Sequence, residues 1–224
     1  DLINFLRKMG CKINWIGKRT IRIIGNRDLK KTNYQVMFDR IEAGTYMIAS
    51  ALTAGNLRIT NIVPKVINTE INILKKIGTK IKIKSNEIIV MGSKKVKCTK
   101  IKTSPYPGFP TDLQAQLMVL LCKANGRSEI TENIFENRFM HVAELNRMGA
   151  KIKVSGNKAI IEGNINFNSA ELMATDLRAS VSLILASLSA KGKSIINRIY
   201  HLDRGYERIE KKLKKIGVNI KRIS

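Results

Sequence analysis

Apolar and polar positions follow one another along the chain in two patterns that alternate. In the first pattern, apolar residues recur every three or four positions, a glycine follows, and a stretch of alternating apolar and polar residues comes next. This arrangement predicts an amphipathic helix, a left-handed glycine at its end, and a strand with one buried face. The pattern occurs four times, at residues 2–15, 70–83, 142–154 and 206–223, with glycines at Gly10, Gly78, Gly149 and Gly217.

The second pattern lies between copies of the first and begins at an aspartate. A run of small and apolar residues follows, then a glycine and a strand-like stretch. A helix that is apolar on nearly every face must be buried on most sides. The three copies span residues 39–64, 111–137 and 175–201 and begin with Asp39, Asp112 and Asp176.

Together the two patterns predict a repeating unit of strand, buried helix, strand, amphipathic helix and hairpin. The hairpin is indicated by alternation, as at Ile152 and Val154, followed by turn residues such as Ser155-Gly156-Asn157. Three such units pack as a ring, with the buried helices inside and the sheets and amphipathic helices outside. The fold class predicted is α/β, in the form of an α+β repeat.

The repeat is incomplete at both ends of the chain. Residues 1–25 hold only the second half of a unit, and the last unit reaches Ser224 after one strand of its hairpin. The chain also begins with Asp1 rather than Met. We therefore expect it to be part of a longer protein, with residues 1–27 as the tail of a first domain and residues 28–224 as a second domain.

Composition raises one rival class of function. The net charge is +24 over 224 residues, which favours a basic nucleic-acid-binding repeat protein. Aromatic residues make up only 5% of the chain, which is few for side chains that stack on nucleic-acid bases. The lysines are spread along the chain rather than gathered in one basic segment. These two features make nucleic acid the less favoured partner.

Cysteine usage and hydropathy exclude two further classes. The three cysteines are irregularly spaced, which is neither a disulfide framework nor a metal-binding pattern, and favours a reducing compartment. No stretch reaches the roughly 18 apolar residues of a membrane span, and the N-terminus lacks a signal-peptide pattern. We expect neither a membrane partner nor secretion.

The repeat places chemistry at the starts of the buried helices. Equivalent helices point the same way, so the three aspartates are expected on one face, each as an N-cap. The N-termini also favour anions, and arginines stand nearby in sequence. They are Arg40 and Arg178 beside two of the caps, and Arg138 and Arg204 after the next strands. These arginines and helix starts predict a site for an anionic small molecule.

Two other features of the sequence bear on this site. His141 and His201 occupy matching places in NRFMH and NRIYH, and we expect them to hold loops rather than to catalyse. Three of the four prolines fall in PYPGFPTD, directly before Asp112. Because proline fixes its own φ and restricts the preceding residue, this segment should hold Asp112 at a set angle.

Four segments resemble a known family. They read FPTDLQAQ, ITENIFENRFMHVAELNRMGAKI, MATDLRAS and RIYHLDRGYERIEKKLKKIG, and the similarity extends over essentially the whole chain. The chain resembles the C-terminal half of the UDP-N-acetylglucosamine 1-carboxyvinyltransferases, which belong to the enolpyruvyl transferases. The resemblance implies domains built of three βαβαββ units, the inside-out α/β barrel.

The resemblance also implies an activity. The family transfers the enolpyruvyl group of phosphoenolpyruvate to the 3-hydroxyl of UDP-N-acetylglucosamine and releases phosphate, without a metal or organic cofactor. This is the first committed step of peptidoglycan synthesis in the bacterial cytoplasm. The site lies between two domains and closes on substrate.

Family motifs assign roles to individual residues. Asp112 of FPTD matches the general base near the sugar hydroxyl, and Arg204 of DRGYERIE matches an arginine that holds phosphoenolpyruvate. Asp176 and Arg178 match residues at the closing cleft, and Ile134 matches an apolar contact with the nucleotide-sugar. The remaining matches lie near the interdomain face and are Asp39, Arg40, Glu136 and Arg138.

The chain also departs from the family pattern. The family's reactive cysteine, a lysine and further arginines lie in the first domain, and none of Cys11, Cys98 and Cys122 matches that cysteine's motif. The strand that begins the second domain is missing as well. We therefore expect the chain to carry half of the site, to need the first domain as its partner, and to be inactive alone. The shikimate-type enolpyruvyl transferases are a second rival, which FENRFMH and DRGYERIE argue against.

Overall fold

The computed structural model describes residues 1–25 and 28–223 and divides into two compact units, Asp1–Asp39 and Arg40–Ser224. Each unit is treated by itself. The domain boundary expected after residue 27 falls at residues 26–27, which lie outside the described residues. That boundary stays a prediction.

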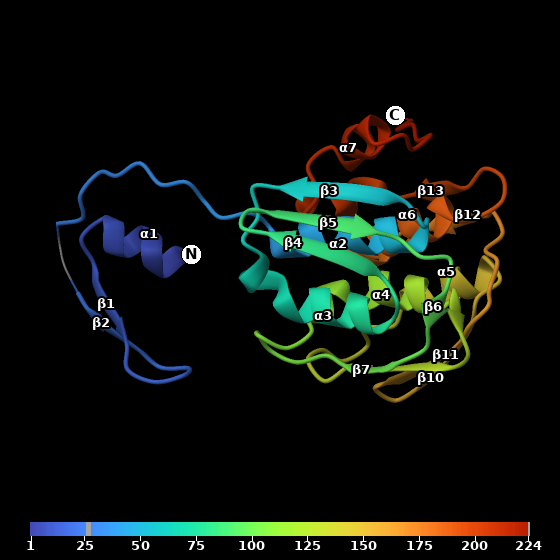
Figure 1. Ribbon diagram of the computed structural model, residues 1–224, viewed down its shortest axis with the longest axis horizontal. Coiled ribbons are helices and arrows are strands. Elements are labelled where there is room, and N and C mark those ends of the chain that lie inside the picture. Colours follow the sequence, from blue (N-terminus) through green and yellow to red (C-terminus); the bar gives the residue numbers. More distant parts are fainter. Residues whose placement is uncertain (26–27, 224) are drawn as a thin grey trace. The chain divides into compact units, whose positions relative to one another are not determined.

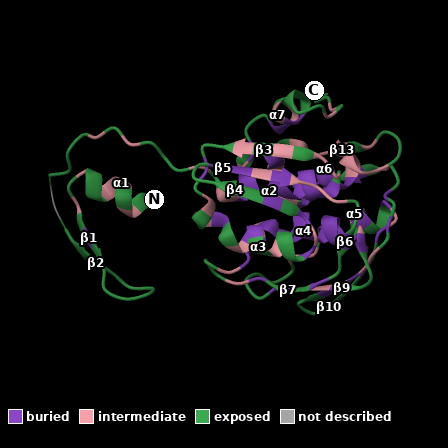
Figure 2. Ribbon diagram, in the orientation of Figure 1, coloured by how far each residue is buried: buried purple, intermediate pink, exposed green. Residues whose placement is uncertain are grey.

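The first unit is a helix followed by a hairpin (Figure 1). Helix α1 spans Leu2–Lys8, and strands β1, Lys12–Trp15, and β2, Ile21–Ile24, pair antiparallel. Gly10 has φ +103°, the left-handed conformation that the sequence pattern predicts after a helix. No residue of α1 is buried, and the hairpin buries only Ile13 among its apolar side chains. Figure 2 shows most of this unit as exposed.

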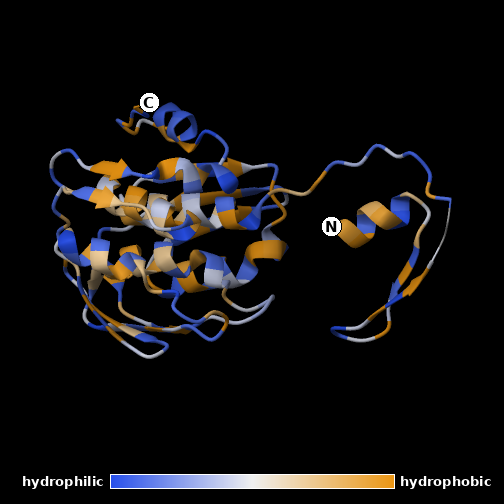
Figure 3. Ribbon diagram, turned by 180° about the vertical axis from the view of Figure 1, so that it is seen from behind, coloured by the Kyte–Doolittle hydropathy of each residue, from blue (hydrophilic) through white to orange (hydrophobic). Residues whose placement is uncertain are grey.

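Three buried helices form the centre of the second unit. They are α2, Arg40–Leu52, α4, Gln114–Leu121, and α6, Leu177–Leu188. Every residue of α4 is buried, and each helix contacts the other two. Figure 2 shows this centre in purple, and Figure 3 shows orange and pale residues along it. The predicted placement of the three apolar helices is confirmed.

The amphipathic helices lie outside this centre. They are α3, Asn68–Lys76, α5, His141–Arg147, and α7, Ile209–Lys215. The glycines that follow them have φ of +106°, +93° and +95°, at Gly78, Gly149 and Gly217. The helix-and-glycine repeat is therefore confirmed. Among residues 1–25 and 28–223, no helix is long and apolar enough to cross a membrane.

Separate sheets cover the helices. One has the order β3-β5-β4 and another the order β10-β11-β9-β7, while β12-β13 and β6-β8 are two-stranded. The second sheet contains the predicted hairpin around Gly156, with Ser155 paired to Lys158. The strand bounds are β3 Asn56–Thr60, β4 Lys80–Lys84, β5 Glu87–Met91, β6 Val96–Lys97, β7 Lys100–Lys102, β8 Ala124–Asn125, β9 Ser128–Thr131, β10 Lys151–Ser155, β11 Lys158–Glu162, β12 Glu171–Met173 and β13 Ile195–Asn197.

Parallel pairing recurs within the repeats of the second unit. β7 pairs parallel with β9, and β12 pairs parallel with β13. Each pair therefore joins the strand before a buried helix to the strand after it, which is the right arrangement for a crossover through that helix. In the described residues β3 pairs only with β5, and no strand precedes α2 in the same place.

Two expectations about strands are wrong. Residues 218–223 form no strand, because no described strand pairs with them to complete a ladder. Alternation predicts Ile152 and Val154 on one buried face, but Val154 is exposed, and Ile83 is exposed in the same place of β4. Both exposed residues stand near the hairpin turn, one residue before the last residue of their strand.

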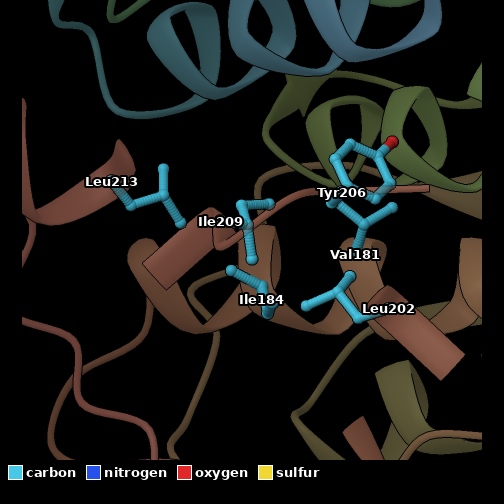
Figure 4. Packing of buried hydrophobic residues seen from close by; sticks show 6 residues of the cluster. All are labelled: Val181, Ile184, Leu202, Tyr206, Ile209 and Leu213. Atoms are coloured by element: carbon cyan, nitrogen blue, oxygen red, sulfur yellow. The ribbon is translucent and has the colours of Figure 1, made fainter. Parts of the chain in front are cut away.

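A buried cluster ties the last repeat to the central helices. Val181 and Ile184 of α6 pack with Leu202, Tyr206, Ile209 and Leu213, and Figure 4 shows these six side chains together. Leu202 lies in the short helix η3, Ile199–Arg204, and the last two lie in α7. The cluster holds the segment that carries Arg204 against α6.

Candidate active site

The carboxylate of Asp112 is the point where two arginines meet. Arg138 Nη2 donates to Asp112 Oδ1 at 3.1 Å, and Arg178 Nε donates to the same oxygen at 3.0 Å. Asp112 lies in the short helix η2, Thr111–Leu113, Arg138 in the loop between β9 and α5, and Arg178 in the first turn of α6. Segments far apart in the sequence thus bring one carboxylate and two guanidinium groups together.

The cluster is open to solvent and carries a net positive charge. The side chain of Asp112 is 37% exposed, and those of Arg138 and Arg178 are 25% and 18% exposed. No described residue donates to Asp112 Oδ2 in the hydrogen bonds of the structure, so this oxygen can accept a proton or a hydroxyl donor. One carboxylate beside two guanidinium groups can also attract an anion.

The expectation that Asp112 is the N-cap of its helix is wrong. α4 begins at Gln114, its N-cap position is Leu113, and no side chain caps it. The reason is the 3₁₀ turn at Thr111–Leu113, which delays the α-helix and leaves the Asp112 carboxylate directed to the arginines. Leu113 is fully buried and lies so near Gly44 of α2 that a side chain at Gly44 would collide with it.

Asp176 does cap its helix, as predicted. Its Oδ1 accepts hydrogen bonds from the backbone N–H groups of Arg178 at 2.7 Å and Ala179 at 3.0 Å. The cap therefore fixes the first turn of α6, and with it the residue that donates to Asp112. Asp39 directly precedes α2 at Arg40.

Removal of the Asp176 cap should destabilise the chain measurably. We expect Asp176→Ala to lower the free energy of unfolding by about 0.5–2 kcal/mol, because two N–H groups of α6 lose their acceptor. Urea unfolding of the 224-residue chain measures the change. Asp176→Asn is the matched control, since asparagine also caps helices well, and an equal loss in both variants would contradict the capping role.

The proline-rich segment before Asp112 is held at several points. Arg40 donates to Glu70 Oε1 at 2.8 Å, and its guanidinium carbon lies 5.3 Å from the centre of the Tyr106 ring. Thr69 Oγ1 donates to the carbonyl of Pro107 at 2.5 Å. Burial raises the pKa of Glu70, against the lowering effect of its hydrogen bonds and of Arg40. Arg40 thus contacts the segment that leads to Asp112.

Three other predicted site residues have exposed side chains. Ile134 and Glu136 are exposed in the loop that carries Arg138, whose guanidinium lies 5.1 Å from the Phe135 ring centre. Arg204 ends η3 with an exposed side chain and donates to no described residue. Its guanidinium is therefore available to a ligand.

Burial argues against acid–base chemistry by His141. The residue is 2% exposed, and its Nε2 has no hydrogen-bond partner among the described residues. Burial lowers the pKa of His141 to about 4, although Asp176 opposes this and Arg138 adds to it. The imidazole is therefore neutral near pH 7. His201 stacks on Tyr200 with ring centres 4.2 Å apart.

Two polar residues near the site were missed by the sequence patterns. Gln116 is fully buried, and its Nε2 donates to the Asp112 carbonyl at 2.9 Å and to Thr45 Oγ1 at 3.3 Å. Glu132 is 3% exposed and accepts four hydrogen bonds. The sequence could have indicated Gln116, because a glutamine within an otherwise apolar helix must find buried hydrogen-bond partners. It could not have indicated Glu132, because a glutamate after a strand is usually a surface residue.

Comparison with known proteins identifies relatives of the whole chain. A family model described as EPSP synthase (3-phosphoshikimate 1-carboxyvinyltransferase) matches residues 1–213. A UDP-N-acetylglucosamine 1-carboxyvinyltransferase of Pelagibacter ubique is 74% identical over 224 residues, which are 100% of this chain and 54% of that protein. Proteins with the same description from Geotalea daltonii and Coxiella burnetii are 52% and 49% identical over 100% of this chain and 54% and 52% of their own lengths.

Solved structures share the fold. The enolpyruvyl transferase NikO from Streptomyces tendae superposes with a TM-score of 0.90 at 28% identity, over 99% of this chain and 53% of that one. An EPSP synthase from Acinetobacter baumannii has a TM-score of 0.79 at 21% identity, over 99% of this chain and 55% of its own, and so supports the fold alone. The chain spans about half the length of the curated relatives it matches.

Proposed function

The chain belongs to the EPSP synthase family of enolpyruvyl transferases, and from this membership we propose that it forms part of a UDP-N-acetylglucosamine 1-carboxyvinyltransferase. The reaction moves the enolpyruvyl group of phosphoenolpyruvate to the 3-hydroxyl of UDP-N-acetylglucosamine and releases phosphate. The observation that carries the proposal is the Asp112 carboxylate between Arg138 and Arg178. Identity of 74% to a relative of that description over the whole chain supports the choice of substrates.

Asp112 is the proposed general base. The sugar 3-hydroxyl must lose its proton as its oxygen bonds to C2 of phosphoenolpyruvate and C3 takes up a proton, and loss of a C3 proton then restores the double bond as phosphate leaves. A carboxylate within hydrogen-bond reach takes the proton of the hydroxyl. Both arginines donate to Oδ1, so Oδ2 is the oxygen left to receive it. Because the side chain is only partly exposed, the carboxylate can meet a substrate and still be fixed by its neighbours.

The arginines are the proposed anion-binding groups. Arg204 is exposed and donates to no described residue, which suits contact with the phosphate or carboxylate of phosphoenolpyruvate. Arg178 and Arg138 add positive charge beside Asp112, and Ile134, which is exposed in the loop of Arg138, is the proposed apolar contact with the nucleotide-sugar. We further propose that Asp39, Arg40, Asp176 and Glu136 lie at the closing cleft, with Arg40 and Asp176 acting through their contacts in this chain.

The cellular role proposed follows from the reaction. Its product is the first committed precursor of peptidoglycan, so the protein would serve cell-wall biogenesis, cell shape and cell division in the cytoplasm. Residues from the other half of the relatives' length would complete the site. The shikimate-type reaction is less well supported, because the EPSP synthase structures are only 20–21% identical to this chain.

Phosphate release tests the proposal. We expect a chimera that joins the preceding half of the Pelagibacter ubique relative to this chain to release phosphate from phosphoenolpyruvate only when UDP-N-acetylglucosamine is added. The 224-residue chain alone should release none, because it supplies only part of the site. Shikimate 3-phosphate replaces the nucleotide-sugar as a control substrate.

Three outcomes would count against parts of this proposal. Turnover of shikimate 3-phosphate in preference to the nucleotide-sugar would reassign the substrate. Turnover by the chain alone would refute the need for the other half. A salt-dependent shift with random duplex DNA, without saturable binding of UDP-N-acetylglucosamine by the chimera, would favour the nucleic-acid-binding alternative.

A further inference from the structure

Glu132 is a buried carboxylate that lies directly after β9 and contacts both sides of the candidate site. It is 3% exposed. Its Oε2 accepts from Thr111 Oγ1 at 2.9 Å, and its Oε1 accepts from Thr103 Oγ1 at 2.8 Å and from the N–H groups of Ile134 and Phe135 at 2.8 and 3.2 Å. All four donors are neutral, and no ion pair of Glu132 occurs among the described residues.

Three of the four donors come from the two segments that carry Asp112 and Arg138. Thr111 begins the 3₁₀ turn and directly precedes Asp112. Ile134 and Phe135 begin the loop that leads to Arg138, which donates to Asp112 from the other side. One carboxylate thus links the turn of Asp112 to the loop of Arg138, and Thr103 at the end of β7 anchors it.

Burial of a carboxylate without an ion pair costs free energy, so the buried Glu132 is expected to fix something in place. A buried carboxylate loses its hydration, and hydrogen bonds from neutral donors repay that loss only when all of them are well placed. A general base must be held close to the position from which it can take its proton, since displacement by about 1 Å can cost a hundredfold in rate. An arrangement that fixes the turn of Asp112 against the loop of Arg138 meets this need.

We propose that Glu132 is a positioning residue that sets the distance between Asp112 and Arg138 through its hydrogen bonds to Thr111 and to the loop at 134–135. This inference rests on the proposed function, because positioning matters only if Asp112 takes a proton. Glu132 itself touches no substrate. Its effect on turnover passes through Thr111, which is the link that a variant can cut without removing the buried charge.

The decisive variant is Thr111→Val, which removes one hydroxyl and keeps the shape of the side chain. In the chimera described above we expect kcat to fall about tenfold, because the turn of Asp112 loses its register, while KM for UDP-N-acetylglucosamine stays within about twofold. Thr103→Val removes the other hydroxyl on the same carboxylate and also the acceptor of the Asn133 N–H. It costs at least as many hydrogen bonds but leaves the Thr111 link intact.

The comparison between the two variants separates positioning from stability. A kcat that falls several times further in Thr111→Val than in Thr103→Val, at equal or smaller loss of denaturation midpoint, supports the proposal. Equal losses of kcat in the two variants would show that Glu132 has only a structural role. The same conclusion would follow if the loss of kcat were proportional to the loss of denaturation midpoint in both variants. Thr53→Val, which removes a hydroxyl bond to the Ala49 carbonyl at the end of α2, controls for the loss of a threonine hydroxyl elsewhere.

A second readout does not depend on catalysis. The N–H of Leu113 donates to the Pro110 carbonyl at 3.1 Å and reports on the turn that contains Asp112. In the 224-residue chain, Thr111→Val should speed hydrogen exchange at Leu113 while exchange at Leu117 stays unchanged. If the unmutated chimera releases no phosphate, the proposed function fails, and the exchange at Leu113 then tests only whether Glu132 fixes the turn of Asp112 through Thr111. If it is active and neither kcat nor exchange responds to Thr111→Val, only the inference fails.

Discussion

Asp112→Asn is expected to lower kcat by about 10²–10⁴-fold in the chimera, which is the range for loss of a general base. Binding of UDP-N-acetylglucosamine should change little, because the amide keeps the size of the carboxylate and an oxygen that can accept from Arg138 and Arg178. The group lost is the one that takes the proton of the sugar hydroxyl. Steady-state phosphate release gives kcat, and isothermal titration with the nucleotide-sugar gives Kd.

Glu162→Gln is the matched control for Asp112→Asn. Glu162 also accepts from an arginine, Arg127, at 2.8 Å, but it is the last residue of β11 and its side chain is 43% exposed. Its neutralisation should leave kcat within experimental error. Turnover of Asp112→Asn near that of the unmutated enzyme would remove Asp112 from the role of base, and an equal loss in both variants would point to a general charge effect.

Tyr206→Ala should be the most destabilising single change considered. The residue is 1% exposed and packs in the cluster of Figure 4, and its hydroxyl lies 2.8 Å from Thr45 Oγ1. Truncation of a large buried aromatic side chain costs about 3–5 kcal/mol through lost burial and the cavity it leaves. Thr45 and Gln116 also lose a buried partner. Denaturant unfolding of the chain measures the effect.

Two further variants interpret the Tyr206 result. Tyr206→Phe removes only the hydroxyl and should cost about 1–3 kcal/mol, the range for a buried polar group left without its partner. Tyr200→Ala, at a residue that is 57% exposed, should change stability by no more than about 0.5 kcal/mol. A loss below about 1 kcal/mol in Tyr206→Ala would show that α7 and η3 do not stabilise the central helices.

Most of the fold could be predicted because its signals are local. The spacing of apolar residues in α3, α5 and α7 and the glycines after them depend only on the chain's own periodicity and on φ near +100°. The run of α4 is apolar except for Gln114 and Gln116, and so required burial whichever elements covered it. Strand formation at 218–223 could not be judged in this way, since a ladder needs a partner that periodicity does not reveal.

The candidate site was only partly predictable. The capping role of Asp176 followed from residue type and position, and the structure has the two hydrogen bonds that define it. The same reasoning was wrong for Asp112, because a 3₁₀ turn precedes α4 and residue preference does not register such a turn. The roles of Arg204, Ile134, Glu136 and Asp39 toward substrate rest on family motifs and stay predictions.

The sequence by itself determined the repeat, the buried and outer helices, the glycine turns and the family. Each of these depends on residues a few positions apart, whose backbone preferences and apolar spacing act within one element. Only the tertiary structure decided that Arg138 and Arg178 share one oxygen of Asp112 and that Glu132 joins Thr111 to the loop at 134–135. The contacts of Asp112 with the two arginines and of Glu132 with Thr111 join residues 21 to 66 positions apart, and such distances are set by the packing of the whole chain.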